Sequence, residues 1–401
     1  MADNNENKVL NVPHLRFPEF SGEWNKYTIN DLATVVGGGT PDTTVKSYWG
    51  GDIQWFTPSE IGKNKYVDFS KRTITRDGLD NSSAKLLPLH TILLSSRATV
   101  GECSIASNEC TTNQGFQSLI AKQCNIDFLY YLIQTKKKDL IRNACGSTFL
   151  EISANEIRKI KVAVPVQNEQ EQIAKLLSLI DERIATQNKI IEDLKKLKSA
   201  ISKYLFARKD LLETTICLSN IATLKNGYAF QSGKYNALGK WKILTITNVP
   251  GERYINDEDC NCIINLPNDI QDHQVLKEGD ILISLTGNVG RVSLCKNGNY
   301  LLNQRVGLLQ LAKNVNQEFL YQILSSQRFE NSMIACGQGA AQMNIGKGDV
   351  ESYVLPYSSN GNNILWVAKI LHSYDECIIN ELRRLTLLTM QKQYLLTQMF
   401  I

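Results

Sequence analysis

Cysteine and histidine side chains are the groups in this sequence that could ligate a metal ion or act as nucleophiles. The 401 residues include ten cysteines and four histidines. No Cys-x-x-Cys pair occurs, Cys260 and Cys262 stand too close for the usual zinc spacing, and the histidines complete no Cys-Cys-His-His pattern. We therefore predict no metal site. The first residues are polar and acidic, unlike a signal peptide, so we expect a cytoplasmic protein with reduced, mostly buried thiols.

Motifs of the common catalytic classes are also missing. Gly346-Lys347-Gly348 lacks the hydroxyl residue and the upstream glycine of a phosphate-binding loop, and neither His-Glu-x-x-His nor Gly-x-Ser-x-Gly occurs. Gly37-Gly38-Gly39 is typical of a turn, because no dinucleotide fingerprint follows a strand there. An Asn-Pro-Pro-Tyr-type tetrapeptide, which an amino-methyltransferase needs to hold an extruded base, is absent too. The sequence favours a binding protein over an enzyme that acts alone.

Composition restricts the kind of partner. Apolar residues make up 43% of the chain and charged residues 21%, as in ordinary globular proteins, and no apolar run is long enough to span a membrane. The net charge is only +4, from 44 Lys+Arg against 40 Asp+Glu. A protein that binds nucleic acid alone is more often strongly basic. If this chain binds DNA, its positive charge is clustered or partner subunits make many of the phosphate contacts.

The chain contains two copies of one domain-sized module. Short motifs recur in the same order at an offset that grows from 189 to 194 residues, as small loop insertions would cause. The duplication predicts a pseudo-two-fold arrangement. The recurring pairs are Ala33-Thr34 with Ala222-Thr223, Val100-Gly101 with Val289-Gly290, Asn113-Gln114 with Asn303-Gln304, Phe128-Leu129-Tyr130 with Phe319-Leu320-Tyr321, Ala144-Cys145-Gly146 with Ala335-Cys336-Gly337, Val164-Pro165 with Leu355-Pro356, and Asp181-Glu182 with Asp375-Glu376.

Each copy begins with a mixed α+β part and ends in a long helix. Short β-prone runs such as 52–57 and 279–284 alternate with turns, and one helix is predicted near 128–141 and another near 319–334. Residues 167–206 contain neither Gly nor Pro, and a second long helix is predicted from about Ile364 to Phe400. The predicted segments are 1–24 (N-terminal segment), 25–166 (first mixed domain), 167–208 (first long helix), 209–363 (second mixed domain) and 364–401 (second long helix).

Both long helices carry a narrow apolar stripe at alternating spacings of four and three. Such a stripe predicts that the helices pair as an antiparallel coiled coil, although each helix could instead pack on its own globule. Gln187 and its counterpart Glu381 fall in the stripe, where a polar residue either fixes the register or marks a local wet spot. The predicted seam comprises Ile173, Leu177, Ile180, Ile184, Gln187, Ile191 and Leu194 of the first helix, and Val367, Leu371, Tyr374, Ile378, Glu381, Leu385 and Leu388 of the second.

This organisation resembles the DNA specificity (S) subunits of type I restriction-modification systems, over essentially the whole chain. Val12–Trp24 is similar to the opening of many such subunits, and Trp55–Ile61 to a pattern near the start of the recognition domain. Gly337–Ile345, followed by an apolar run that ends at Pro356, resembles the segment that closes each domain. The second copy departs from the family after this proline, because Tyr357–Asn363 replaces the usual Glu-Gln entry to the helix.

The resemblance implies a mechanism. Each mixed domain would be a target recognition domain for one half of a bipartite, asymmetric site on double-stranded DNA. The helices would separate the two domains and dock two methyltransferase (M) subunits, which carry S-adenosylmethionine and methylate adenine. Restriction (R) subunits would add translocation and cleavage driven by ATP with Mg²⁺. The chain itself would bind no cofactor and catalyse no reaction.

Base contacts are expected from Arg, Lys, Asn and Gln on loops. Because Asn113-Gln114 and Asn303-Gln304 recur in both copies, they could instead be scaffold. Lys136-Lys137-Lys138 is expected to be a solvated helix face, and Trp55 and Trp241 core aromatics. The candidates are Arg97, Thr99, Asn113, Gln114, Ser147 and Thr148 in the first copy, and Asn288, Arg291, Asn303, Gln304, Arg305, Gln338 and Gln342 in the second.

Two other classes stay open on the sequence alone. One is a nuclease or methyltransferase that acts without partners, which the missing motifs disfavour. The other is a stand-alone DNA-binding protein or coiled-coil adaptor with no role in restriction.

Overall fold

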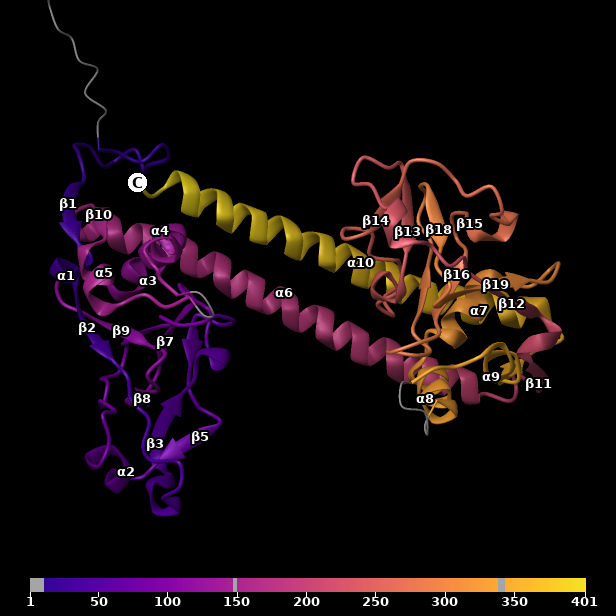
Figure 1. The fold of residues 1–401 in the computed structure, drawn as a ribbon, viewed down its shortest axis with the longest axis horizontal. Helices are drawn as coiled ribbons and strands as arrows, with labels where there is room; N and C mark the ends of the chain where they lie inside the picture. Colours follow the sequence, from indigo (N-terminus) through magenta and orange to yellow (C-terminus); the bar gives the residue numbers. More distant parts are fainter. Residues whose placement is uncertain (1–10, 147–149, 338–342) are drawn as a thin grey trace, which may run out of the picture. The chain divides into compact units, whose positions relative to one another are not determined.

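The computed structural model describes residues 11–146, 150–337 and 343–401. These residues form two compact units. The first runs through Asn188 and includes Arg384–Ile401, and the second comprises Lys189–Arg383. Each unit therefore holds one mixed α/β globule together with a stretch of both long helices. The units cut across the predicted segments 167–208 and 364–401, because each globule packs against both helices (Figure 1).

The first globule is built on three small sheets. A five-stranded sheet has the order β2-β9-β6-β7-β4, a three-stranded sheet the order β5-β3-β8, and β1 pairs with β10. The strands are β1 (Asn25–Thr28), β2 (Ala33–Gly37), β3 (Trp49–Phe56), β4 (Tyr66–Val67), β5 (Arg72–Ile74), β6 (Ile92–Leu94), β7 (Cys103–Ala106), β8 (Cys110–Thr112), β9 (Gln117–Ala121) and β10 (Lys161–Val164). The short helices are α1 (Ile29–Leu32), α2 (Arg76–Asp80), α3 (Ile126–Thr135), α4 (Lys137–Arg142) and α5 (Ala154–Lys159).

The second globule repeats this topology. One four-stranded sheet has the order β12-β19-β16-β17, another has the order β14-β13-β18-β15, and β11 pairs with β20. The strands are β11 (Thr214–Cys217), β12 (Ala222–Asn226), β13 (Trp241–Leu244), β14 (Asn261–Ile263), β15 (Val275–Leu276), β16 (Ile281–Ser284), β17 (Val292–Leu294), β18 (Tyr300–Leu302), β19 (Val306–Leu311) and β20 (Val354–Tyr357). The helices are α7 (Gln317–Leu324), α8 (Gln327–Cys336) and α9 (Lys347–Glu351). The duplication seen in the sequence is thus a duplication of the fold.

The predicted helices 128–141 and 319–334 are each two helices, so that prediction was wrong in detail. The backbone leaves the helix at Lys136 (φ −89°, ψ 7°), between α3 and α4. In the second copy the side chain of Ser326 accepts a hydrogen bond from the backbone N of Phe329 and starts α8 afresh. The starts of α3 and α7 are capped alike, because Asn125 and Asn316 accept from the backbone N three residues on.

The two long helices are α6 (Gln167–Ala207) and α10 (Gly361–Gln398). The second starts at Gly361 rather than at Ile364, because Asn360 Oδ1 accepts a hydrogen bond from the backbone N of Asn362 at 3.0 Å and caps this end. In the first unit the early residues of α6 pack with the late residues of α10, and in the second unit the late residues of α6 pack with the early residues of α10. This is the order that antiparallel helices produce.

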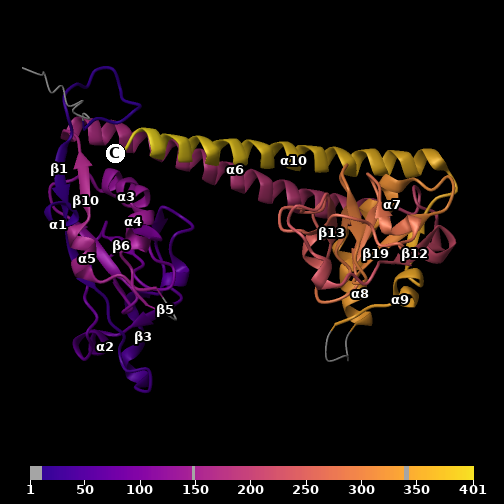
Figure 2. The same ribbon diagram turned by 45° about the horizontal axis from the view of Figure 1, so that its top comes forward.

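All fourteen predicted seam residues are buried or half-buried. The stripe does not contact helix alone, however. Ile173, Leu177 and Ile180 join the apolar cluster of the first globule, and Val367 and Leu371 join that of the second. Both views of the fold show α3 and α4 beside α6, and α7 beside α10 (Figures 1 and 2). Helix pairing and packing on the globule, taken as alternatives from the sequence, therefore occur together.

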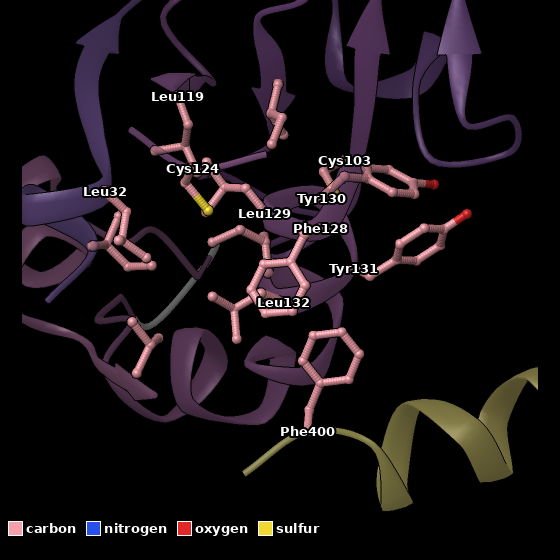
Figure 3. Packing of buried hydrophobic residues seen from close by; sticks show 14 of the residues in the cluster. Leu32, Cys103, Leu119, Cys124, Phe128, Leu129, Tyr130, Tyr131, Leu132 and Phe400 are labelled. Atoms are coloured by element: carbon pink, nitrogen blue, oxygen red, sulfur yellow. The ribbon is translucent and has the colours of Figure 1, made fainter. Parts of the chain in front are cut away.

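Residues near the C-terminus complete the first core, which the sequence did not predict. Leu395, Leu396, Met399 and Phe400 lie in the same cluster as the globule. The ring of Phe400 stacks on Phe128 with centroids 5.2 Å apart and meets Trp24 edge-on at 6.3 Å. Figure 3 shows Phe400 extending from the end of α10 toward Phe128. The last residues of the chain thereby anchor α10 on the first globule.

Candidate nucleic-acid interface

A loop that follows β6 in the first globule is closed at both ends by backbone hydrogen bonds. Ser95 N donates to Glu102 O at 2.8 Å, and Gly101 N donates to Ser95 O at 3.0 Å. The loop rests between two other segments, since Ser96 N donates to Gly115 O and Ile152 N donates to Ser96 O. Its tip, residues 97–99, is exposed to solvent.

The loop after β16 in the second globule has the same hydrogen bonds. Ser284 N donates to Arg291 O at 2.9 Å, and Gly290 N donates to Ser284 O at 3.0 Å. Leu285 connects this loop to two other segments, because its backbone N donates to Arg305 O and its backbone O accepts from Ile345 N. The backbone of this element is therefore the same in both copies, although the side chains at the tip differ.

A second pair of loops is built around the recurring Asn-Gln motif. Asn113 Oδ1 accepts from Gly115 N at 2.9 Å, and Asn303 Oδ1 accepts from Arg305 N at 3.2 Å, so each asparagine closes an Asx turn. The close packing of these turns requires glycine on the neighbouring segment. A Cβ on Gly38 would lie 2.1 Å from Asn113 O, and one on Gly227 would lie 2.1 Å from Asn303 O. The geometry favours a scaffold role for both asparagines, whereas Gln114 and Gln304 are exposed.

A third pair of loops lies at the ends of β3 and β13, and the sequence analysis identified only the first. Glu60 Oε2 accepts from Thr57 N at 2.8 Å, and in the second copy Asn248 Oδ1 accepts from Thr245 N at 2.8 Å. The signal that could have revealed the match is the shared Thr-x-x-polar spacing at an offset of 188 residues. Ser59 and Thr247 are the exposed residues of these turns.

We refer to residues 57–60, 95–101 and 113–115 as the first loop cluster, and to 245–248, 284–290 and 303–305 as the second. Within the first, Asn113 N donates to Phe56 O, and in the second Asn303 N donates to Leu244 O, so the loops of each cluster are tied to one another. The segments 150–152 and 343–345 flank the clusters. Ser147, Thr148, Gln338 and Gln342 lie outside the described residues.

The remaining predicted contact residues divide into two groups. Arg97, Thr99, Asn288 and Arg305 are exposed at loop tips. The guanidinium of Arg97 lies 3.7 Å from Glu151 Oε2 and stays about half exposed, so this exposed pair holds it only weakly. Arg291 is different, because its Nε lies 3.5 Å from Glu330 on α8 and it lines a small hollow away from the tip. Its side chain is 38% exposed, beside that hollow rather than free at the loop tip.

Other sequence predictions concerned the surroundings of these loops. Trp55 is buried and its Nε1 donates to Gly39 O at 2.9 Å, as expected of a core aromatic, and Trp241 is half-buried. Lys136 Nζ donates to Ile401 O, and Lys137 pairs with Glu102, so two of the three consecutive lysines contact protein. Burial lowers the pKa of Lys136.

Within the described ranges no group of His, Cys, Asp or Glu could hold a metal ion, and no helix is long and apolar enough to cross a membrane.

A duplicated mixed α/β module that presents three tied loops, and that is attached to long helices, is the architecture of a two-domain specificity protein. The family model described as the type I restriction modification DNA specificity domain matches the chain twice, at residues 21–196 and 213–390. The chain belongs to this family of specificity subunits.

Curated relatives and solved structures agree with this assignment. The chain is 38% identical over 192 residues to the type I restriction enzyme MjaIX specificity subunit of Methanocaldococcus jannaschii, which covers 46% of this chain and 44% of that protein. It is 28% identical over 206 residues to the EcoR124I/EcoR124II specificity subunit of Escherichia coli, covering 49% and 50%. The chain thus spans about half the length of the curated relatives it matches. The S subunit structure from M. genitalium has the same fold, with a TM-score of 0.58, 18% identity, and coverage of 97% and 99%.

Proposed function

We propose that this chain is the sequence-specific DNA-binding subunit of a type I restriction-modification complex, and that each loop cluster contacts one half of a bipartite, asymmetric target. One observation carries the proposal: the two clusters share a backbone scaffold but differ in their exposed side chains. The arginine that the first cluster presents at Arg97 has Thr286 as its counterpart, whereas the second cluster presents Arg305 where the first has Gly115.

The chemistry of the exposed groups suits base recognition. Arginine donates two hydrogen bonds to guanine, and asparagine or glutamine forms a bidentate pair with adenine. The first cluster offers Arg97 and Gln114, and the second offers Asn288, Gln304 and Arg305. Because the arginine stands on a different loop in each cluster, the two clusters would favour guanine at different positions. Phosphate contacts add affinity without sequence information, and the net charge of +4 leaves part of them to partner subunits.

The partners in this proposal are two methyltransferase subunits and restriction subunits, which would carry S-adenosylmethionine, ATP and Mg²⁺. This chain would dock them and catalyse no step. Exposed apolar residues on the long helices support a docking role, since large apolar side chains gathered on an exposed face mark interaction sites. On α10 they include Leu387, Met390 and Tyr394, spaced along one face of the helix, and on α6 they include Leu179, Leu197 and Tyr204.

The recognition role is tested by footprinting DNA with the assembled complex after its methylated adenines have been mapped in a host genome. We expect protection of two short segments separated by an unprotected or sequence-independent spacer. If neither segment is protected, the result would favour the alternative of a coiled-coil adaptor. Methylation by the purified chain without partners would instead favour a stand-alone enzyme.

The modular role is tested by exchanging residues 25–150 for those of a relative. Because the exchanged range contains the first loop cluster and none of the second, one half of the methylated site should change and the other half should stay. A matched exchange of 214–345 should change the other half. Changes in both halves after either exchange would refute the assignment of one half-site to each globule.

The docking role is tested by deleting Lys175–Ile201 of α6. The variant should no longer co-purify with the methyltransferase subunit, whereas a variant with changes confined to the tip of the first loop cluster, Arg97→Ala, should co-purify as the parent does. Assembly retained after the deletion would place the dock on another part of the chain.

A further inference from the structure

A polar junction connects the first globule to both long helices. Asp181 of α6 accepts a hydrogen bond from the hydroxyl of Tyr131 at 2.7 Å, and its other oxygen lies 2.7 Å from Lys392 Nζ of α10. Lys65, from the globule, pairs with Asp127 at 2.7 Å and donates to Ser178 Oγ of α6 at 2.6 Å. Figure 3 shows Tyr130 and Tyr131 at one edge of the apolar cluster, with their hydroxyl oxygens pointing away from it.

The second unit contains the same junction with the helices exchanged. Asp375 of α10 accepts from Gln322 Nε2 at 2.6 Å, and its other oxygen lies 2.5 Å from Lys198 Nζ of α6. Arg253, from the globule, forms a two-pronged pair with Glu318 at 2.7 and 2.9 Å and also donates to Asp375 at 2.9 Å.

Apart from Ser178, every member of one junction is the repeat counterpart of a member of the other. The offsets are 188 residues for Lys65 and Arg253, 191 for Asp127 and Glu318 and for Tyr131 and Gln322, and 194 for Asp181 and Asp375 and for Lys198 and Lys392. The residue types have changed at three of these pairs. The ion pair within each globule and the two contacts of each helix aspartate persist, whereas Lys65 donates to Ser178 and Arg253 donates to Asp375. Each long helix supplies the acid to its own globule and the lysine to the other one.

These groups are costly to bury, which makes a purely stabilising role a poor account of them. The side chains of Arg253 and Asp375 are each 8% exposed. Desolvating an ion pair offsets most of its attraction, and apolar residues of similar volume would hold the surfaces together at least as well. Burial by itself would raise the pKa of Glu318, yet hydrogen bonds from Arg253 and Gln322 outweigh it and lower that pKa, so the carboxylate is held ionised.

Direction is what a polar junction adds to apolar packing. The clusters around Ile173 and Leu177, and around Val367 and Leu371, are held by the hydrophobic effect, which is itself non-directional. Hydrogen bonds from a globule to one helix, combined with an ion pair from the other helix, are satisfied in one orientation only.

We infer that the two junctions are positioning devices, centred on Asp181 with Lys392 and on Asp375 with Lys198, that fix the angle of each recognition globule on the helices and thereby set which spacer length the protein accepts. The inference rests on the proposed function. One added base pair moves a half-site by about 3.4 Å and rotates it by about 35°. A globule held at one angle rejects that displacement, and a globule free to turn accepts part of it.

The test uses the full chain assembled with its methyltransferase subunit and DNA that carries the mapped target with its native spacer, or with one base pair added or removed. The measured quantity is the ratio of methylation rates on native and altered spacers. Breaking either junction, with Lys392→Met or with Lys198→Met, should lower this ratio by about tenfold, the size expected for removing one coupled contact. Lys392→Arg should keep the parent ratio because it restores the charge.

Two further variants separate positioning from general damage. Tyr131→Phe removes only the hydroxyl that Asp181 accepts from, keeps the buried ring, and should lower the ratio in the same direction. Lys196→Met removes an exposed lysine paired with Glu192 on the same helix and should leave the ratio unchanged. Unchanged ratios in the junction variants, or an equal loss of activity on all spacers, would overturn the inference. A parent complex that methylates no bipartite site would instead refute the proposed function.

Discussion

Truncating Phe400 should release the end of α10 from the first globule. The side chain is 6% exposed, and its ring contacts Phe128 and Trp24. Burial of a phenylalanine side chain contributes about 1.5–3 kcal/mol, and each aromatic pair about 0.5–1.5 kcal/mol more. Substitutions of this kind in cores cost about 3–5 kcal/mol. Because a chain end can collapse into the space left behind, we expect about 3 kcal/mol for Phe400→Ala.

Hydrogen exchange localises this loss. A local cost of about 3 kcal/mol lowers the protection of the amides that open with it by about 100-fold. We expect the fall in residues 390–399 and in α3, while residues 364–378, which pack on the second globule, keep their protection. Tyr394→Ala is the matched control on the same helix, since Tyr394 is 59% exposed and should change protection little. Equal effects of the two substitutions, or a loss spread over both units, would refute the reasoning.

Three further predictions concern the loops, the start of α10 and the thiols. Gly38→Ala and Gly227→Ala should each lower the free energy of unfolding by about 2 kcal/mol in denaturant titrations, because the new methyl group would overlap a backbone carbonyl. Gly233→Ala is the control, since its new methyl group meets nothing within 4 Å and should leave the free energy of unfolding unchanged. Hydrogen bonds from Ser358 and Ser359 lower the pKa of Glu213 from 4.5 to about 2. The carboxylate therefore stabilises the start of α10 fully above pH 4.5, and this stabilisation is lost as the pH falls toward 2. Amide protection of residues 359–363 should follow this course, and Glu213→Gln should abolish the pH dependence. Thiol labelling at pH 8, followed by mass spectrometry, should modify the exposed Cys145, Cys336 and Cys377. It should spare Cys103 and Cys110, because burial raises the pKa of both thiols to about 12. Rapid labelling of either buried thiol would contradict the packing.

The sequence predicted the duplicated fold because its signals are local or repeated. The stripes on α6 and α10 follow from spacing within one helix, and the recurring short motifs revealed that the second globule repeats the first. Details of individual helix ends were missed. The break at Ser326 and the start at Gly361 each depend on one capping side chain. The break at Lys136 is a local change of backbone angles without a side-chain cap, and the surrounding apolar pattern reveals none of the three.

Contacts between distant segments were beyond sequence reasoning. Phe400 and Met399 fall where the apolar stripe loses its spacing and join the core of the first globule. Phe400 contacts Phe128 and Trp24, more than 250 positions earlier in the chain. The three loops of a cluster are joined by backbone hydrogen bonds, such as Ile152 N to Ser96 O, that no side-chain pattern encodes. The repeat did suggest that motifs shared by both copies could be scaffold, and Asn113 and Asn303 close turns in both copies.

In the proposed complex, the loop clusters and the polar junctions would have different roles in recognition. Each base contact discriminates by about 1–3 kcal/mol, so one cluster with a few exposed residues distinguishes only a short sequence. Two clusters on one chain multiply their selectivity when both engage the same duplex, and the gain depends on geometry that lets them engage together. Loop tips such as Arg97 and Arg305 differ between the copies, whereas the junctions around Asp181 and Asp375 keep their contacts. In the proposed complex, differences at the loop tips would change the bases contacted, and the conserved junctions would hold each globule at one angle on the helices.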